Sequence, residues 1–149
     1  MLEKHIEQDL KAALLSGDKT TVTTLRGLKS VLLYAKVAEG KREEGLTDEA
    51  VIALLSKEAK KRQESADLYV QGGSQERADA ELTEKALIET YLPAQMDEAE
   101  LSKIIDSVIS QTGTTAIAGM GPVIAAVRAK TGSSADGSTI ARLVKERLS

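Results

Sequence analysis

Apolar side chains recur along most of the chain at intervals of three and four residues. This spacing predicts helices over residues 2–16, 19–39, 47–71, 74–92 and 97–112, and two more that begin near 119–122 and after 137. The segment 97–112 shows the pattern most clearly, because its five aliphatic residues from Leu101 to Ile109 fall on one helical face. In the segment 19–39, Val31, Leu33 and Tyr34 widen the apolar stripe, which predicts that this helix contacts neighbours on two sides.

Residues that start and stop helices lie between these segments. Asp18, Thr47 and Asp97 each precede an apolar stripe and predict N-caps, because their side-chain oxygens accept hydrogen bonds from first-turn N–H groups. We expect the helices over 47–71 and 74–92 to form a long antiparallel hairpin with Gly72-Gly73 at its tip. Residues 56–65 contain one alanine and no larger apolar side chain, so we expect this stretch to follow solvent or bridge other elements, outside any deep core.

Pro93 ends the fourth helical segment and divides the chain. Proline cannot continue a helix and biases Leu92 away from helical dihedral angles, and a new N-cap follows at Asp97. The sequence therefore predicts an all-α fold in two parts. Residues 1–92 form an N-terminal multi-helix domain that contains the hairpin, and residues 93–149 form a small C-terminal three-helix domain.

Composition limits the chemistry that the chain can carry. With 42% apolar and 29% charged residues it is globular, and with no cysteine and only His5 it has neither disulfides nor a multi-histidine metal centre. The net charge of −3 argues against DNA binding through bulk charge, so nucleic-acid contact needs a local basic patch. No apolar run approaches the roughly 20 residues of a membrane span. Because the N-terminal residues 1–10 also lack the apolar core of a signal peptide, we expect a cytoplasmic protein without membrane contact.

The motifs that would indicate catalysis or a bound cofactor are missing. Gly40-Lys41 lacks the upstream glycine and the preceding strand of a P-loop. Gly119-Met120-Gly121 follows no strand, and we interpret it as a helix start that needs close backbone approach. Acidic clusters stand at predicted helix starts, where they complement the helix dipole. We therefore predict no catalytic residue, no metal site and no cofactor.

Two groups of basic residues remain as binding candidates. One lies on the second and third helices, where Lys57, Lys60 and Lys61 share a face with Arg62 beside them, and the other lies near the C-terminus. The candidates for RNA contact are Arg26, Lys29, Lys57, Lys60, Lys61, Arg62, Arg128, Lys130, Arg142 and Lys145. The simpler interpretation is a solvated face balanced by Glu58 and Glu64. The functional one is a strip that contacts phosphates of a folded RNA, since no aromatic residues lie nearby to stack on bases.

Several short motifs follow one another along essentially the whole chain. They are Leu25-Arg26 with Lys29, Lys60-Lys61-Arg62 with Ser65, Glu81-x-x-Glu84 before Glu89-Thr90-Tyr91-Leu92-Pro93, Met120-Gly121-Pro122-Val123-Ile124, Ala135-Asp136-Gly137, and Leu143-Val144-Lys145. In this order and spacing the chain resembles the YqeY family, which is similar to the C-terminal region of the B subunit of the tRNA-dependent amidotransferase (the GatB/YqeY group). One departure is Ser134, which stands where the family often has a lysine and removes one basic side chain from the expected RNA-facing loop.

The resemblance implies an all-helical fold with a longer N-terminal part and a three-helix C-terminal domain. In the amidotransferase the corresponding region helps to hold tRNA, while amide transfer occurs elsewhere. Our leading hypothesis is therefore a non-catalytic accessory protein associated with tRNA or another folded RNA. Two alternatives stay open. One is a protein-interaction module that binds a protein partner without RNA, and the other is an accessory subunit in glutamine-dependent amide transfer, a carbon–nitrogen ligase reaction.

Overall fold

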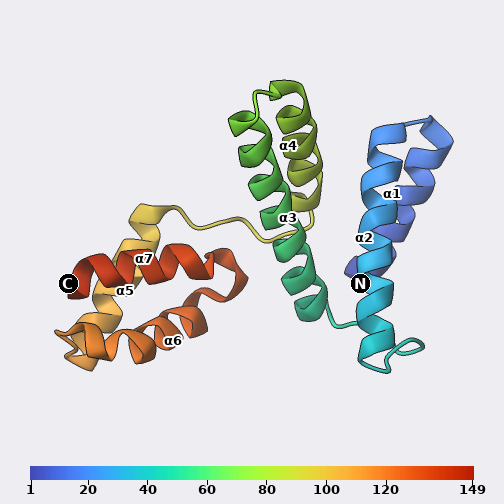
Figure 1. Cartoon of the computed structure of the whole chain (residues 1–149). Helices are drawn as coiled ribbons and strands as arrows, with labels where there is room; N and C mark the ends of the chain where they lie inside the picture. The colour runs from blue at the N-terminus through green and yellow to red at the C-terminus, as the bar shows by residue number, and fades with distance from the viewer. The chain divides into compact units, whose positions relative to one another are not determined.

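The computed structural model describes all residues 1–149 and confirms the all-α prediction (Figure 1). Its helices are α1 (Leu2–Ser16), α2 (Lys19–Ala38), α3 (Asp48–Gln71), α4 (Gln75–Glu89), α5 (Glu98–Thr112), α6 (Met120–Thr131) and α7 (Gly137–Leu148), with single 3-10 turns at Ile117–Gly119 and Gly132–Ser134. The chain forms two compact units, Met1–Leu92 and Pro93–Ser149. None of the helices has both the length and the apolar character that a membrane span requires.

The predicted N-caps form as expected. The side chain of Asp18 accepts a hydrogen bond from the Thr21 N–H at 3.1 Å, and Thr47 and Asp97 cap α3 and α5 in the same way. Gly17 ends α1 with a φ of 74°, a left-handed conformation that glycine adopts without steric penalty. These local signals set where the helices begin and end, and so determine which faces of the helices can meet.

In the first unit, α1 and α2 form one antiparallel pair, and α3 and α4 form the long hairpin whose tip is Gly72-Gly73 (Figure 1). The core between the pairs is aliphatic apart from Tyr91, and its members include Ile6, Leu10, Leu25, Leu28, Leu32, Leu46, Val51, Leu55, Ile88 and Tyr91. Towards the tip, the buried side chains of the hairpin are Ala66 and Ala78, which allow α3 and α4 to approach closely.

Two expectations about this unit hold only in part. The stretch 56–65 does enter the interior, because Glu58 and Ala59 are both buried. Glu58 continues the inward stripe of α3 three residues after Leu55, and ion pairs replace apolar contacts around it. The second concerns α2: the helix does contact α1 as well as α3 and α4, but Leu33 and Tyr34 take no part in these contacts and are exposed.

The second unit packs α5, α6 and α7 around one aliphatic core. Its fully buried members are Leu101, Ile105, Val108, Val123, Val127, Ile140 and Val144. A Cβ placed on Gly119 would lie 2.3 Å from Thr114 Cγ2, so the Thr114 side chain packs closely on the Gly119 backbone before α6. The Met96 N–H donates to the Ser134 carbonyl at 2.7 Å and ties the start of the unit to the α6–α7 connection.

Candidate nucleic-acid interface

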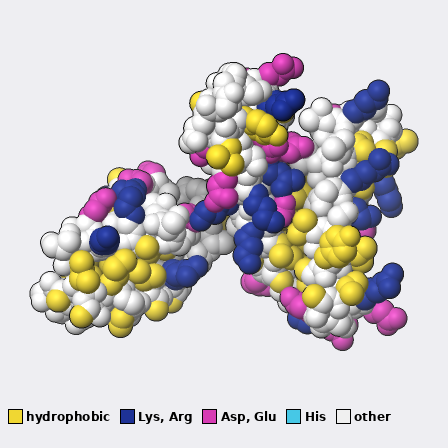
Figure 2. Space-filling model, viewed as in Figure 1, with side chains coloured by type: hydrophobic (Ala, Val, Ile, Leu, Met, Phe, Trp, Pro, Cys, Tyr) yellow, Lys and Arg dark blue, Asp and Glu magenta, His cyan; other side chains and the backbone are white.

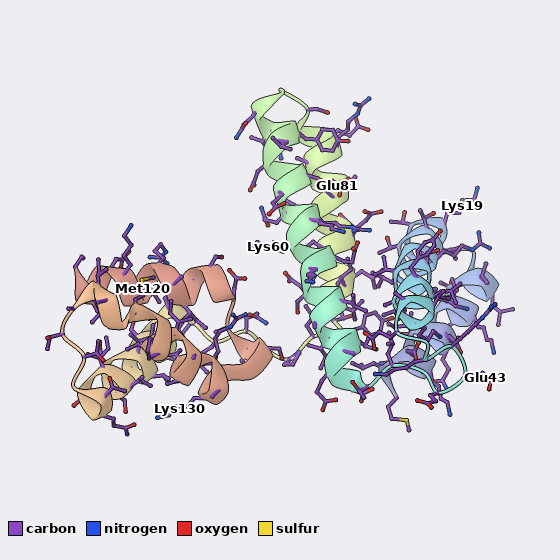
Figure 3. The ribbon with its side chains drawn as sticks, turned by 60° about the horizontal axis from the view of Figure 1, so that its bottom comes forward. Lys19, Glu43, Lys60, Glu81, Met120 and Lys130 are labelled. Carbon is purple, nitrogen blue, oxygen red and sulfur yellow. The ribbon has the colours of Figure 1, made fainter.

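The three lysines predicted on one face of α3 do share its outward face. Lys57, Lys60 and Lys61 are all exposed, and Figure 3 shows Lys60 about halfway along α3. The inward stripe of Val51 and Leu55 turns these positions outward, because residues 57, 60 and 61 fall on the opposite side of a helix with 3.6 residues per turn. The ammonium groups of these lysines can therefore reach a ligand without disturbing the core.

Arg62 lies on the other side of α3, inside a network of ion pairs. Its guanidinium donates to the buried carboxylate of Glu58, and its Nε lies 3.5 Å from Glu84 Oε2 on α4. Lys61 Nζ also donates to Glu58, at 3.1 Å, and the Thr24 hydroxyl of α2 lies 3.4 Å from Glu84 Oε1. Burial alone would raise the pKa of Glu58, but the bonds from Lys61 and Arg62 outweigh it and hold this pKa below the ordinary range. Arg62 therefore links α3 to α4, and Glu84 extends the link to α2, while the Arg62 side chain is only 19% exposed.

The candidates on α2 divide in the same manner. Arg26 is exposed and has no acidic partner. Lys29 Nζ lies 3.7 Å from Glu7 Oε1, and Lys36 Nζ lies 2.9 Å from Glu3 Oε1, so both lysines pair with α1. Burial opposes the ionisation of Glu3, yet the Lys36 ammonium and a backbone N–H lower its pKa on balance. Of these cations, Arg26 is the one whose charge is not already balanced by a neighbour.

In the second unit, Arg128, Lys130 and Lys145 are exposed and lack acidic partners. Lys130 lies in the last turn of α6, as Figure 3 shows. The Arg128 side chain lies against the start of α7, where a Cβ on Gly137 would be 3.2 Å from Arg128 Nη2. Gly137 thus makes room for this guanidinium.

The remaining candidate of this unit, Arg142, forms ion pairs with two carboxylates. It donates to Glu98 of α5 and, at 3.1 Å, to Glu146 of its own helix, and these two partners raise the pKa of its guanidinium. Arg147 Nε likewise donates to Asp106 at 2.5 Å. These pairs connect α7 to α5, so both arginines have a structural role in addition to any contact with a ligand.

Sequence reasoning missed a second polar group, which lies at Tyr91. The Tyr91 hydroxyl donates to Asp9 at 2.5 Å, and His5 Nε2 lies 3.5 Å from the same carboxylate oxygen. Burial and the Asp9 charge raise the pKa of Tyr91 well above its ordinary value, so the phenol stays a protonated donor. A hollow of about 400 Å³ beside it is lined by carboxylate, hydroxyl and apolar groups. Asp9 and Tyr91 are 82 positions apart, so no local motif indicates their pairing.

No three side chains of the His, Cys, Asp or Glu type gather into a group that could hold a metal ion. The sequence model of the YqeY family, described as Yqey-like protein, matches residues 3–148. The chain belongs to the YqeY family. It is also 32% identical over 90 residues to Altered inheritance of mitochondria protein 41, mitochondrial, of Eremothecium gossypii, covering 60% of this chain and 48% of that protein. The chain thus spans about half the length of this curated relative. Because the relative's name places it in mitochondria, a cytoplasmic location for this chain stays a prediction.

The motifs that carry the resemblance have clear structural roles in this YqeY-family chain. Arg62 and Glu84 meet in the ion-pair network of the first unit. Tyr91 closes the core of that unit through its bond to α1. Asp136 caps α7 through the Thr139 N–H at 3.4 Å. Part of these motifs therefore holds the fold together, whereas Arg26 and Lys145, which also belong to them, are exposed.

Proposed function

We propose that this YqeY-family protein is a non-catalytic accessory protein that binds tRNA or another folded RNA through phosphate contacts. The observation that carries the proposal is the division among the candidate cations. Arg26, Lys57, Arg128, Lys130 and Lys145 are exposed and have no acidic partner, whereas other cations of the set are held in ion pairs.

Exposed cations of this kind suit phosphate recognition. Each phosphate contact releases condensed counterions, so binding weakens steeply as salt increases. Long, flexible lysines act as point charges that follow a backbone without reading bases. The overall charge of −3 means that such binding depends on where these side chains lie and not on bulk attraction.

A filter-binding titration of the full chain with tRNA tests the proposal. We expect binding tighter than about 100 µM at low salt, where phosphate contacts are strongest. Lys57→Gln and Lys130→Gln should each weaken binding to different RNA sequences alike. Each should also reduce the slope of log affinity against log salt by about one.

Lys11→Gln is the matched control, because Lys11 is an exposed lysine of α1 outside the candidate set. It makes the same charge change, and its salt slope should stay that of the wild type. Absence of binding at low salt would refute the proposal. An equal effect of Lys11→Gln would also refute it, because the attraction would then be diffuse and not localised at the candidate cations.

A further inference from the structure

The outward face of α2 carries apolar side chains that nothing in the structure covers. Leu33, Tyr34 and Val37 are 45%, 76% and 56% exposed. They fall on one side of the helix with Arg26 and Ser30, and we call these five residues the α2 face. Figure 2 shows the resulting hydrophobic patch over α2, with Lys and Arg side chains on both sides of it. Contiguous exposed apolar patches on soluble proteins commonly mark interaction sites.

Gly27 adds an independent observation on the same helix. It lies in the interior of α2, where glycine is less favourable than alanine. Yet a Cβ placed on it would meet nothing within 4 Å, so no contact within the protein requires the missing side chain. Gly27 and Ser30 are small residues next to Tyr34. At this place the backbone of another molecule can approach α2 closely.

The charge of α2 indicates the kind of molecule that fits. The helix contains Lys19, Arg26, Lys29 and Lys36 and no acidic residue. Lys29 and Lys36 are balanced by α1, whereas Lys19 and Arg26 have no acidic partner. A complementary surface would present apolar side chains to the patch and carboxylates to these cations.

We propose that the α2 face docks an acidic amphipathic helix of another protein. Apolar residues of that helix at i, i+3 or i+4 and i+7 would pack on Leu33, Tyr34 and Val37, and flanking Asp or Glu would meet Lys19 and Arg26. This inference is independent of the proposed RNA binding, which uses other cations apart from Arg26.

Three other occupants fit the α2 face less well. A second copy of this chain packed through the same face would bring Arg26 and Lys19 against like charges. An anionic membrane would also meet Glu3 and Glu7, the carboxylates that pair with Lys36 and Lys29 beside the patch. RNA could stack one base on Tyr34, but it would gain little from Leu33 and Val37 on either side, which offer no donor to a phosphate and no ring for a base.

Site-specific photo-crosslinking tests the proposal in cells that make the full-length protein. A benzoylphenylalanine probe replaces Tyr34, and the same probe at Leu15, which is 90% exposed on α1, serves as the control. We expect the Tyr34 probe to capture a segment of another protein, identified by peptide sequencing, with apolar residues at helical spacing and flanking acids. Capture of lipid, RNA or this chain itself would overturn the proposal. So would products identical to those of the Leu15 probe, or no product.

Binding of the captured segment, made as a synthetic peptide, then measures the contact. Tyr34→Ser and Val37→Ser should each weaken it at least tenfold, whereas Leu68→Ser, which removes an equally exposed side chain from α3, should leave it unchanged. Gly27→Ala should raise the unfolding midpoint, because alanine is more favourable than glycine in a helix interior, and still weaken peptide binding severalfold. Unchanged binding would refute the proposed close approach of the peptide at Gly27. Tyr34→Ser should retain wild-type affinity for tRNA, which separates this proposal from RNA binding.

Discussion

Glu58→Gln should destabilise the first unit through the loss of one buried charge. Glu58 is 6% exposed and accepts hydrogen bonds from Lys61 and Arg62, which in turn approaches Glu84 on α4. Glutamine preserves the shape and one acceptor but removes the charge. Arg62 then keeps only its 3.5 Å approach to Glu84 for charge compensation.

The expected loss of stability depends on which hydrogen bonds and ion pairs of the network remain in the variant. Removing one partner of a fully buried pair costs about 3–5 kcal/mol. Here Lys61 can turn to solvent and Arg62 keeps Glu84, so we expect about 2 kcal/mol at pH 7, within the range for hydrogen bonds to charged groups. With an m-value of about 1.3 kcal/mol/M, typical of a small domain, the urea midpoint should fall by about 1.5 M.

The effect should depend on pH in a defined direction. The network lowers the pKa of Glu58 below its ordinary 4.5. A carboxylate with a lowered folded-state pKa contributes its stabilisation fully above the unfolded-state pKa, and loses it as pH falls through the folded-state value. Because glutamine does not titrate, the difference between wild type and Glu58→Gln should stay constant from pH 7 to about 5.5 and shrink below about 4.5.

Tyrosine fluorescence during urea unfolding of the full chain is the assay. Tyr34, Tyr69 and Tyr91 are the only tyrosines, all lie within Met1–Leu92, and the chain has no tryptophan, so the signal reports the first unit alone. Glu64→Gln is the matched control, because Glu64 is exposed on the same helix, and it should change stability by less than about 0.5 kcal/mol. Equal effects of the two variants at pH 7, or a difference that does not shrink as pH falls below about 4.5, would refute the reasoning.

Two further substitutions test other contacts. Gly119→Ala should reduce hydrogen-exchange protection of the α6 amides by about 1–3 kcal/mol, because the new Cβ would lie 2.3 Å from Thr114 Cγ2, whereas Gly121→Ala enters open space and should leave protection unchanged. Tyr91→Phe should lower stability in urea, followed by circular dichroism, by about 1 kcal/mol, because it removes a 2.5 Å hydrogen bond to a carboxylate of α1. Tyr69→Phe should have no comparable effect, and a loss equal to that of Tyr91→Phe would show that the bond to α1 adds nothing.

The sequence could predict the helices because their signals are local. The caps at Asp18, Thr47 and Asp97 and the left-handed turn at Gly17 each depend on a few neighbouring residues. The spacing of the aliphatic residues also predicts which face of each helix is buried. The same reasoning is only partly right at α2. The helix contacts α1 as well as α3 and α4, but its apolar stripe is wider than these neighbours cover, and Tyr34 is exposed.

The candidate site could be predicted only in part. Where polar residues lie on the buried face of a helix, the hydrophobic pattern does not show that this face is buried. Spacing placed Lys57, Lys60 and Lys61 on one face, and the structure agrees. It could not show that Arg62 turns inward, because the partner that matters, Glu84, lies on another helix. One signal was present: Glu58 and Arg62 follow Leu55 at +3 and +7, which continues the apolar stripe with charged residues.

The position of this network suggests why charges occupy an interior stripe. Towards the hairpin tip, the buried contacts between α3 and α4 are Ala66 and Ala78, small residues that would pack almost equally well after a slip of one turn. A buried ion pair gives little net stability compared with apolar packing, but it strongly penalises an arrangement that leaves one charge unpaired. A one-turn slip, about 5.4 Å, would separate Arg62 from Glu84, whereas the bonds of Glu58 to Lys61 and Arg62 lie within α3 and would persist. We infer that the Arg62–Glu84 pair favours the observed register of the hairpin and that Glu58 contributes by holding the Arg62 guanidinium towards α4. Glu58→Gln should therefore loosen the packing at Ala66 and Ala78 as well as lower stability.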